Sequence, residues 1–186
     1  ILVNGETFRD SKSIANKFNT FFSEIASKVA ADIPYTSCKP EDYLNDTDLN
    51  FELGAVTPDE ILEIAKLIQG KNSHDIDGVN SKLLKKVIHE VAIPLAHIFT
   101  LSFKTGSFPE RLKVARTCPI YKSGDKDCMN QYRPISCLPV ISKLIEKIVF
   151  RKLYGYLSTN KFLYDNQFGF QPGKSTLHPH LKIIDY

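Results

Sequence analysis

The sequence has no segment suited to cross a membrane or to direct secretion. No apolar run approaches the roughly 20 residues that a helix needs to span a bilayer. The N-terminus also lacks a basic region followed by a continuous apolar stretch, which is the pattern of a secretory signal. We therefore expect neither secretion nor membrane insertion.

Cysteine is sparse, and its spacing does not suit a disulfide framework or a structural zinc site. The four cysteines are Cys38, Cys118, Cys128 and Cys137. None belongs to a close pair with the two-residue gap that zinc sites commonly use. The last three would need His89 and His97 to complete a set of metal ligands, so we expect free thiols in a reducing compartment and no metal.

Charge is unevenly distributed along the chain, although the net charge is only +3. Residues 1–60 carry five basic and eleven acidic side chains, a net charge of −6, whereas residues 61–186 carry nineteen and ten, a net charge of +9. We expect the second part to hold any polyanion, because lysine and arginine displace counterions from phosphates. A solvated basic face on an ordinary globular protein is the alternative interpretation.

The first predicted helix follows a cap at Asp10 or Ser11 and is unusually aromatic on its apolar side. That side consists of Ile14, Phe18, Phe21, Phe22, Ile25 and Val29. We expect it to pack in a core; an exposed stripe that binds a partner is the alternative. From residue 32 to 54 the periodicity gives way to an acidic, turn-rich loop. We therefore divide the chain into a helical linker region, 1–54, and a main unit, 55–186.

A second helix is predicted from a cap at Thr57, with Pro58 in the first helical position and Glu60 completing a capping box. Its buried side consists of Ile61, Ile64, Ala65 and Ile68. Gly70 is expected to end it. In the turn-rich loop at 71–80, Asp75 and Asp77 are assigned loop and cap roles, because the ligand spacing of an EF-hand is absent.

A third helix is predicted after this loop, and Pro94 is expected to break or kink it. Its apolar positions are Leu83, Leu84, Val87, Ile88, Val91, Leu95, Ile98, Phe99 and Leu101. A fourth helix is predicted from Pro139 to Leu157. Its expected buried residues are Leu144, Ile145, Ile148, Leu153 and Leu157, and its expected exposed residues are Lys143, Lys147, Arg151 and Lys152.

Between these helices the sequence predicts a basic β-hairpin. Residues 112–121 alternate as a strand does, and Pro119 favours an edge or a terminus. Residues 122–127 are typical of a turn, and 132–136 of a returning strand. The predicted fold class is α+β, mostly helical with a small antiparallel sheet.

Several segments together resemble a known family. Residues 130–147 read Asn-Gln-Tyr-Arg-Pro-Ile-Ser-Cys-Leu-Pro-Val-Ile-Ser-Lys-Leu-Ile-Glu-Lys, and residues 167–176 read Gln-Phe-Gly-Phe-Gln-Pro-Gly-Lys-Ser-Thr. Pro119-Ile120-Tyr121-Lys122 and Gly124-Asp125 precede them, and further matching segments lie at 14–22, 77–85 and 106–109. In order and spacing they resemble the reverse transcriptases of non-LTR (LINE-type, jockey-like) retrotransposons over nearly the whole chain.

The resemblance implies the linker, the fingers and the start of the palm of a right-handed polymerase, with the hairpin as the fingertip. Lys122 and Arg133 would sit on its two strands and hold the triphosphate of a deoxynucleoside triphosphate. Residues 167–176 would form a turn beside template and primer, in which Gly169 and Gly173 allow close approach of the backbone. The implied nucleic-acid contacts are Gln167, Gly169, Phe170, Gly173, Lys174, Ser175 and Thr176.

The same resemblance implies partners and a cofactor. An RNA template, a DNA primer and the palm and thumb of the same polyprotein would be the partners, with no membrane. Mg²⁺ would serve the complete enzyme but would not bind this fragment alone. The implied location is the cytoplasm and nucleus, as a ribonucleoprotein. A fingers piece normally packs on its palm, so we also expect exposed apolar surface.

Departures from the family limit what the fragment is expected to do. Gln171 stands where relatives often carry arginine, and Pro179 fits only the first turn of a helix. The spacing of Gly169 and Gly173 excludes a nucleotide-binding P-loop. The family's palm aspartates have no counterpart, and the surroundings of Asp185 do not match them. We therefore expect no catalytic residue here and no polymerisation by the fragment.

Two other classes of function remain open at this stage. The first is a noncatalytic nucleic-acid-binding remnant or domesticated module that uses the basic second part of the chain. The second is a helical interaction protein whose aromatic N-terminal helix docks on a partner.

Overall fold

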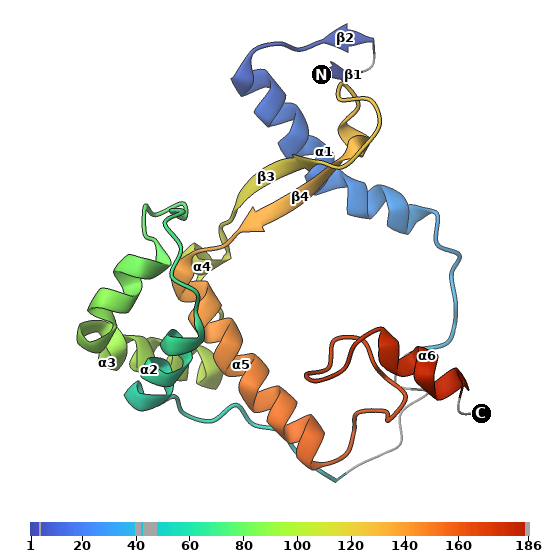
Figure 1. Cartoon of the computed structure of the whole chain (residues 1–186). Helices are drawn as coiled ribbons and strands as arrows, with labels where there is room; N and C mark the ends of the chain where they lie inside the picture. Colours follow the sequence, from blue (N-terminus) through green and yellow to red (C-terminus); the bar gives the residue numbers. More distant parts are fainter. Residues whose placement is uncertain (4, 40–41, 43–47, 185–186) are drawn as a thin grey trace.

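The computed structural model describes residues 1–3, 5–39, 42 and 48–184. Its helices are α1 (Ser11–Ala31), α2 (Pro58–Leu67), α3 (Ser81–Thr105), α4 (Glu110–Lys113), α5 (Val140–Thr159) and α6 (Leu177–Ile184). Its strands are β1 (Leu2–Val3), β2 (Glu6–Thr7), β3 (Arg116–Tyr121) and β4 (Tyr132–Cys137). Figure 1 shows α2 to α5 gathered together, α1 beside the two hairpins, and α6 apart with the loop that precedes it. The predicted mixture of helices with a small antiparallel sheet is confirmed.

The main hydrophobic core lies between α2, α3 and α5. Its buried members are Val56, Ile61, Ile64, Ala65, Ile68, Leu84, Ile88, Ala92, Leu95, Ala96, Phe99, Val140, Leu144, Ile145 and Ile148. These positions recur at three- and four-residue steps, so each helix buries one stripe. The predicted burial of the second helix is confirmed at all four positions, and that of the fourth at its first three.

Helix α2 begins as predicted but ends earlier. Thr57 Oγ1 accepts a hydrogen bond from the Glu60 amide at 3.2 Å, while the Glu60 carboxylate lies 3.4 Å from Lys152 Nζ. The expected end at Gly70 is wrong, because Ile68 is already extended, with φ −78° and ψ 126°. That extended turn directs Ile68 into the core, where it is 7% exposed.

Helix α3 continues through Pro94, so of the two expected effects the break is wrong, and the kink stays a prediction. Proline removes the hydrogen bond to the Glu90 carbonyl. Both residues are exposed, so water can satisfy that carbonyl and the helix need not end. It ends at Gly106, whose φ of 64° is the left-handed conformation of a glycine cap.

One side of α3 is uncovered, contrary to its predicted burial. Leu84, Ile88, Leu95 and Phe99 are buried, whereas Leu83, Val87, Ile98 and Leu101 are exposed. The reason is that α2 and α5 cover only one side of the helix. By length and composition α3 is the one described helix that could cross a membrane, but its buried stripe is that of a core helix. The expected exposed apolar surface is confirmed here.

Helix α5 differs from its prediction near its second half. Leu153 is exposed rather than buried, and Lys152 lies on the inner side. The Lys152 ammonium donates to the Ala55 carbonyl at 3.0 Å. The aliphatic stem of Lys152 is partly buried, while its ammonium group has polar partners in the Ala55 carbonyl and the Glu60 carboxylate. Arg151 is exposed as predicted and pairs with Glu63 at 2.7 Å, which lowers the pKa of the Glu63 carboxyl and raises that of Arg151.

The predicted hairpin is confirmed, but its first strand starts later than expected. Residues 110–113 form α4, and β3 begins at Arg116. The buried Ser142 hydroxyl donates to the Leu112 carbonyl at 2.7 Å and thereby anchors α4 to α5. In the ladder Arg116 pairs with Cys137 and Tyr121 with Tyr132. Pro119 lies opposite Pro134; a two-stranded sheet has only edge strands, where proline is tolerated.

Helix α1 packs on this hairpin and not in the main core. Asp10 caps it, accepting from the Ser13 amide at 2.9 Å, and this bond lowers the pKa of Asp10. Of the predicted apolar side, Phe18 is buried and Ile14, Phe21 and Phe22 are partly buried. The prediction is wrong for Ile25 and Val29, which are 38% and 61% exposed. Parts of the acidic loop, residues 40, 41 and 43–47, lie outside the described residues, and its other described stretches, 32–39 and 48–54, contain no helix or strand.

Candidate nucleotide and nucleic-acid interface

The β3–β4 hairpin brings Lys122 and Arg133 to the same side of the sheet. Arg133 lies opposite Ile120, and Lys122 follows β3, with its amide bound to the Gln131 carbonyl at 2.8 Å. Opposite residues project to one side and alternate residues share it, so Lys122 and Arg133 are diagonal neighbours. Lys122 is thus one residue beyond the strand on which it was expected.

Both cations are exposed and available to a ligand. Within the described residues, neither side chain has a hydrogen-bond or ion-pair partner. Lysine supplies a compact charge and arginine a planar fork with two parallel donors. Two such groups on the same side of one hairpin are suited to bind an anionic group with several oxygens, such as a phosphate chain.

The other side of the hairpin is fixed by aromatic packing. The Tyr132 ring lies 4.9 Å from that of Phe18 on α1 and 5.6 Å from that of Tyr121. The Tyr132 hydroxyl donates to the Lys126 carbonyl at 2.8 Å, and the Tyr121 hydroxyl donates to the Gly124 carbonyl at 2.6 Å. Because α1 occupies this side, Lys122 and Arg133 face away from α1.

The turn at the hairpin tip is closed by Gly124. Its φ is +90°, and a Cβ there would lie 2.8 Å from the Gln131 side chain. Asp125 Oδ1 accepts from the Asp127 amide at 2.8 Å, which tightens the same turn. The Leu2 amide donates to the Asp127 carbonyl at 3.0 Å, so the N-terminal hairpin rests against the tip.

The base of the hairpin is held by Asp75, whose long-range role the sequence did not indicate. Asp75 Oδ1 accepts from the amides of Asp77 and Val79 at 3.0 and 2.8 Å. Its other oxygen accepts from the Val140 amide, the first of α5, at 2.9 Å. The predicted loop role is confirmed, and Asp75 also acts as a cap, although the helix is α5 and its Val140 lies 65 residues away. The predicted cap role is wrong for Asp77, which pairs with Arg111 instead. Helix α3 is capped by Asn80, which accepts from the Leu83 amide.

The rest of that loop contacts α4 and the start of β3. Asp77 pairs with Arg111 of α4, and the Arg116 guanidinium donates to the His74 carbonyl at 3.1 Å. Loop 74–79 thus touches both chain segments that enter and leave the hairpin. These contacts set the direction in which the hairpin projects from the helices, as Figure 1 shows.

The predicted nucleic-acid contacts at 167–176 lie in a loop before α6, separate from Lys122 and Arg133. Gln167 Nε2 donates to the Gly169 carbonyl at 3.4 Å, and Ser175 donates its amide to His178 Nδ1 at 3.0 Å. The Thr176 carbonyl lies 2.6 Å from His180 Nδ1. Pro179 is the third residue of α6, in the first turn, as expected.

One glycine and one phenylalanine of this loop have positive φ, while the predicted close approach of its backbone to nucleic acid stays a prediction. Gly173 is left-handed, with φ 74°, but Gly169 is not among the positive-φ residues. Phe170 takes that role instead, with φ 60°, and its side chain is fully exposed. The Lys174 ammonium lies 5.6 Å from the centre of the Phe168 ring, a cation–π contact. The exposed Phe170 ring is suited to stack on a nucleic-acid base, whereas the Phe168 ring that Lys174 contacts is half-buried.

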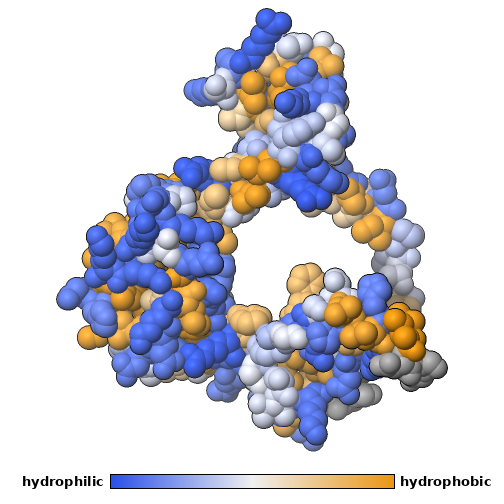
Figure 2. Space-filling model, in the orientation of Figure 1, coloured by the Kyte–Doolittle hydropathy of each residue, from blue (hydrophilic) through white to orange (hydrophobic). Residues whose placement is uncertain are grey.

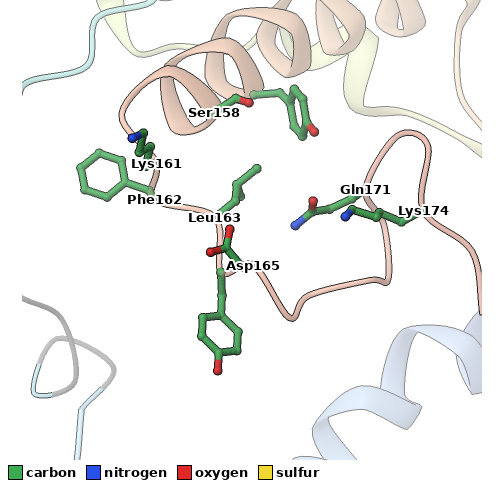
Figure 3. A pocket seen from close by; sticks show the side chains of 9 residues that line it. Ser158, Lys161, Phe162, Leu163, Asp165, Gln171 and Lys174 are labelled. Atoms are coloured by element: carbon green, nitrogen blue, oxygen red, sulfur yellow. The ribbon is translucent and has the colours of Figure 1, made fainter. Parts of the chain in front are cut away.

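A cavity of about 650 Å³ lies between the end of α5 and this loop (Figure 3). Gln171 and Lys174 project from the loop toward Leu163 and Asp165, and Lys161 lies at the far end. Gln171 Nε2 is buried without a hydrogen-bond partner among the described residues.

No cluster of three or more metal-binding side chains occurs in the described part of the chain. Asp185 lies outside the described residues. One literal Phe-x-Asp sequence, Phe8-Arg9-Asp10, does occur, but Asp10 is the cap of α1 and has no second carboxylate in such a cluster.

Searches against known proteins found polymerases of mobile elements. The chain is 32% identical over 130 residues to a probable RNA-directed DNA polymerase from transposon BS of Drosophila melanogaster, covering 69% of this chain and 14% of the relative. It is 25% identical over 156 residues to the RNA-directed DNA polymerase from mobile element jockey of the same species, covering 82% and 17%. For the probable polymerase from transposon X-element of that species, the identity is 25% over 134 residues, covering 70% and 15%.

No family model matches the chain. It spans between 14% and 17% of the length of these three curated relatives. The homologues of this chain are therefore RNA-directed DNA polymerases of mobile elements, of which it corresponds to a short part.

Proposed function

We propose that this chain is the linker and fingers portion of a reverse transcriptase from a non-LTR retrotransposon. Residues 1–54 would form the linker and residues 55–186 the fingers with the start of the palm. The observation that carries the proposal is the exposed, unpaired placement of Lys122 and Arg133 on one side of the hairpin. Homology to mobile-element polymerases supports it.

In this proposal the two cations bind the triphosphate of an incoming deoxynucleoside triphosphate. Phosphoryl transfer depends mainly on positioning and on stabilising negative charge, which lysine and arginine supply. Aromatic packing on the other side of the hairpin keeps both side chains on the ligand-facing side. Mg²⁺ would serve the complete enzyme, held by the aspartates of its palm.

Residues 167–176 would contact template and primer. Lys174 supplies a phosphate contact, and exposed Phe170 supplies a stacking surface. The complete enzyme would act in the cytoplasm and nucleus as a ribonucleoprotein. The competing function is a noncatalytic nucleic-acid-binding module that uses the net positive charge of residues 61–186.

The test is a titration of the chain with a labelled RNA–DNA hybrid over a salt series, with and without a deoxynucleoside triphosphate. Lys174→Ala should weaken binding under both conditions. Lys122→Ala and Arg133→Ala should weaken it only when the triphosphate is present. Lys104→Ala, which removes an exposed cation at the far end of α3, is the matched control.

Two results would contradict this proposal. Binding that is insensitive to the triphosphate in every variant would favour the noncatalytic module. Magnesium-dependent primer extension by the purified chain would overturn the assignment to fingers alone, because it would require a catalytic site within these residues.

A further inference from the structure

A second basic surface, outside the sites described above, lies on the helical core. A cavity of about 580 Å³ is lined by the end of α2, the loop before α3 and the start of α5. Three lysines border it, Lys71, Lys143 and Lys147, together with one carboxylate, Glu146. We call these three lysines the lysine rim.

The loop side of the lysine rim is held in place by a buried hydroxyl. Ser81 is 7% exposed, and its Oγ accepts from the Lys71 amide at 2.7 Å and donates to the Gln69 carbonyl at 2.8 Å. These two bonds fix the backbone on both sides of Gly70 against the start of α3. The position of Lys71 at the rim is therefore set before any ligand binds.

The helix side of the rim is equally fixed. Lys143 and Lys147 are four residues apart, so their side chains lie one above the other on the same face of α5. Leu144, Ile145 and Ile148 on the opposite face have no exposed surface, which fixes the rotation of the helix. The backbone positions of both lysines at the cavity are consequently fixed.

The charge of the rim is not balanced within the described residues. None of its three ammonium groups has a hydrogen-bond or ion-pair partner there, whereas Arg151 and Lys152 on the same helix pair with Glu63 and Glu60. Three cations face one carboxylate, so the surface favours a ligand with several negative charges.

The lining of the cavity indicates which anion fits. It contains no aromatic side chain, so it offers no platform on which a base could stack. Lysine ammonium groups bind phosphates as point charges and carry no sequence information. A sugar–phosphate backbone fits such a surface, because it needs no stacking platform and presents successive phosphates, whatever the sequence, at a regular spacing.

We propose that the lysine rim binds the sugar–phosphate backbone of a nucleic-acid strand, independently of sequence. This site extends the nucleic-acid contact from the loop at 167–176 to the helical core, and it rests on the proposed function. Glu146 opposes binding, since its carboxylate adds repulsion at the same surface.

The test uses the RNA–DNA hybrid titration with variants of opposite expected sign. Lys143→Gln, Lys147→Gln and Lys71→Gln should each weaken binding equally for unrelated sequences, and each should lower the salt slope by about 1. Glu146→Gln should strengthen binding. Lys104→Gln should change nothing, because Lys104 lies about 35 Å along α3 from Ser81.

Acetylation of lysines, followed by mass spectrometry, provides a second measurement. Bound hybrid should protect Lys71, Lys143 and Lys147 but leave Lys104 as reactive as in the free chain. A deoxynucleoside triphosphate alone should not protect the rim. Protection by the triphosphate would overturn the proposal, because it would assign the rim to a free nucleotide.

The outcomes separate this inference from the function on which it rests. If Lys174→Ala weakens hybrid binding while all three rim variants bind with the wild-type affinity and slope, the lysine rim is refuted and the proposed function stands. If the wild-type chain, shown to be folded by circular dichroism, binds no hybrid at low salt, both are refuted.

Discussion

The helical core and the β3–β4 hairpin are stabilised in different ways. In the core, α2, α3 and α5 share a cluster of buried side chains, several of which have no exposed surface. In residues 116–137 no side chain is buried, and the strands are held by their ladder and by the aromatic contact with α1. Lys122 and Arg133 therefore lie on a part of the molecule that no buried side chain stabilises.

This difference has a general basis. A hairpin without a buried face is marginal in water, so its geometry depends on what it packs against. Figure 2 shows that apolar surface remains exposed on the molecule, and the exposed residues of α3 contribute to it. Substitutions in the core can therefore be tested by the change in the free energy of unfolding. Substitutions at the contacts of the hairpin are tested by the change in its orientation relative to the helices.

The largest expected effect is in the core. Phe99→Ala should lower the free energy of unfolding by about 3–5 kcal/mol, because it removes a fully buried ring and leaves a cavity. Ile120→Ala, at a hairpin position that is 48% exposed, should cost less than about 1 kcal/mol. Urea titration followed by circular dichroism measures both. Equal decreases in the free energy of unfolding for the two variants would contradict the difference in stabilisation between the core and the hairpin.

The next effect concerns the junction of the two regions. Asp75→Ala should cost about 2–4 kcal/mol, since three backbone N–H groups lose their acceptor. Asp75→Asn keeps one oxygen as an acceptor and should cost less. Asp77→Ala, which removes a largely exposed ion pair with Arg111, should cost less than about 1 kcal/mol.

Thermal unfolding compares these three variants, and hydrogen exchange at the Val140 amide reports directly on the junction. A wild-type midpoint for Asp75→Ala would show that the carboxylate does not hold the hairpin base.

A smaller and local effect is expected on the hairpin side. Phe18→Ala removes the ring that contacts Tyr132 and should speed amide exchange in α1 by about tenfold, equivalent to about 1.4 kcal/mol. Exchange in α2, α3 and α5 should not change, because Phe18 lies outside their core. Phe21→Ala is the matched control on the same helix. Faster exchange throughout the core would show that the two regions unfold together.

The smallest expected effect is a pH dependence in the stability of the first turn of α1. The hydrogen bond from the Ser13 amide lowers the pKa of Asp10 below its ordinary value of 3.8. The folded pKa is depressed, so this contribution to stability is complete above the ordinary value and is lost as pH falls through the folded pKa. The first turn of α1 should therefore fray in acid, so that its amide hydrogens exchange faster. Asp10→Asn should abolish that pH dependence. Nuclear magnetic resonance of the Ser13 amide measures it.

Local features were predictable from the sequence because their determinants are close together. The Thr57 cap, the Asp10 cap and the paired strands each depend on residues within a short segment. Their side chains satisfy or pair the backbone of immediate neighbours, so spacing alone indicates the structure. The same applies to placing Lys122 and Arg133 near each other across a turn.

Features that depend on tertiary contacts were not predictable in this way. Leu83 and Leu84 are both apolar, and only the position of α2 and α5 decides which is buried. The inward placement of Lys152 depends on Glu60 and on the Ala55 carbonyl, about 90 residues away. The lysine rim joins residues from segments whose apposition no local pattern indicates.

The two oxygens of Asp75 imply an order of assembly. The bonds from Asp77 and Val79 are local and can form when loop 74–79 does, whereas the bond from Val140 must await residues 65 positions later. The early bonds restrict the carboxylate before α5 arrives, so closing that long loop requires less further ordering. During synthesis, α2, α3 and their loop would accordingly position the Asp75 carboxylate for α5 before α5 is made.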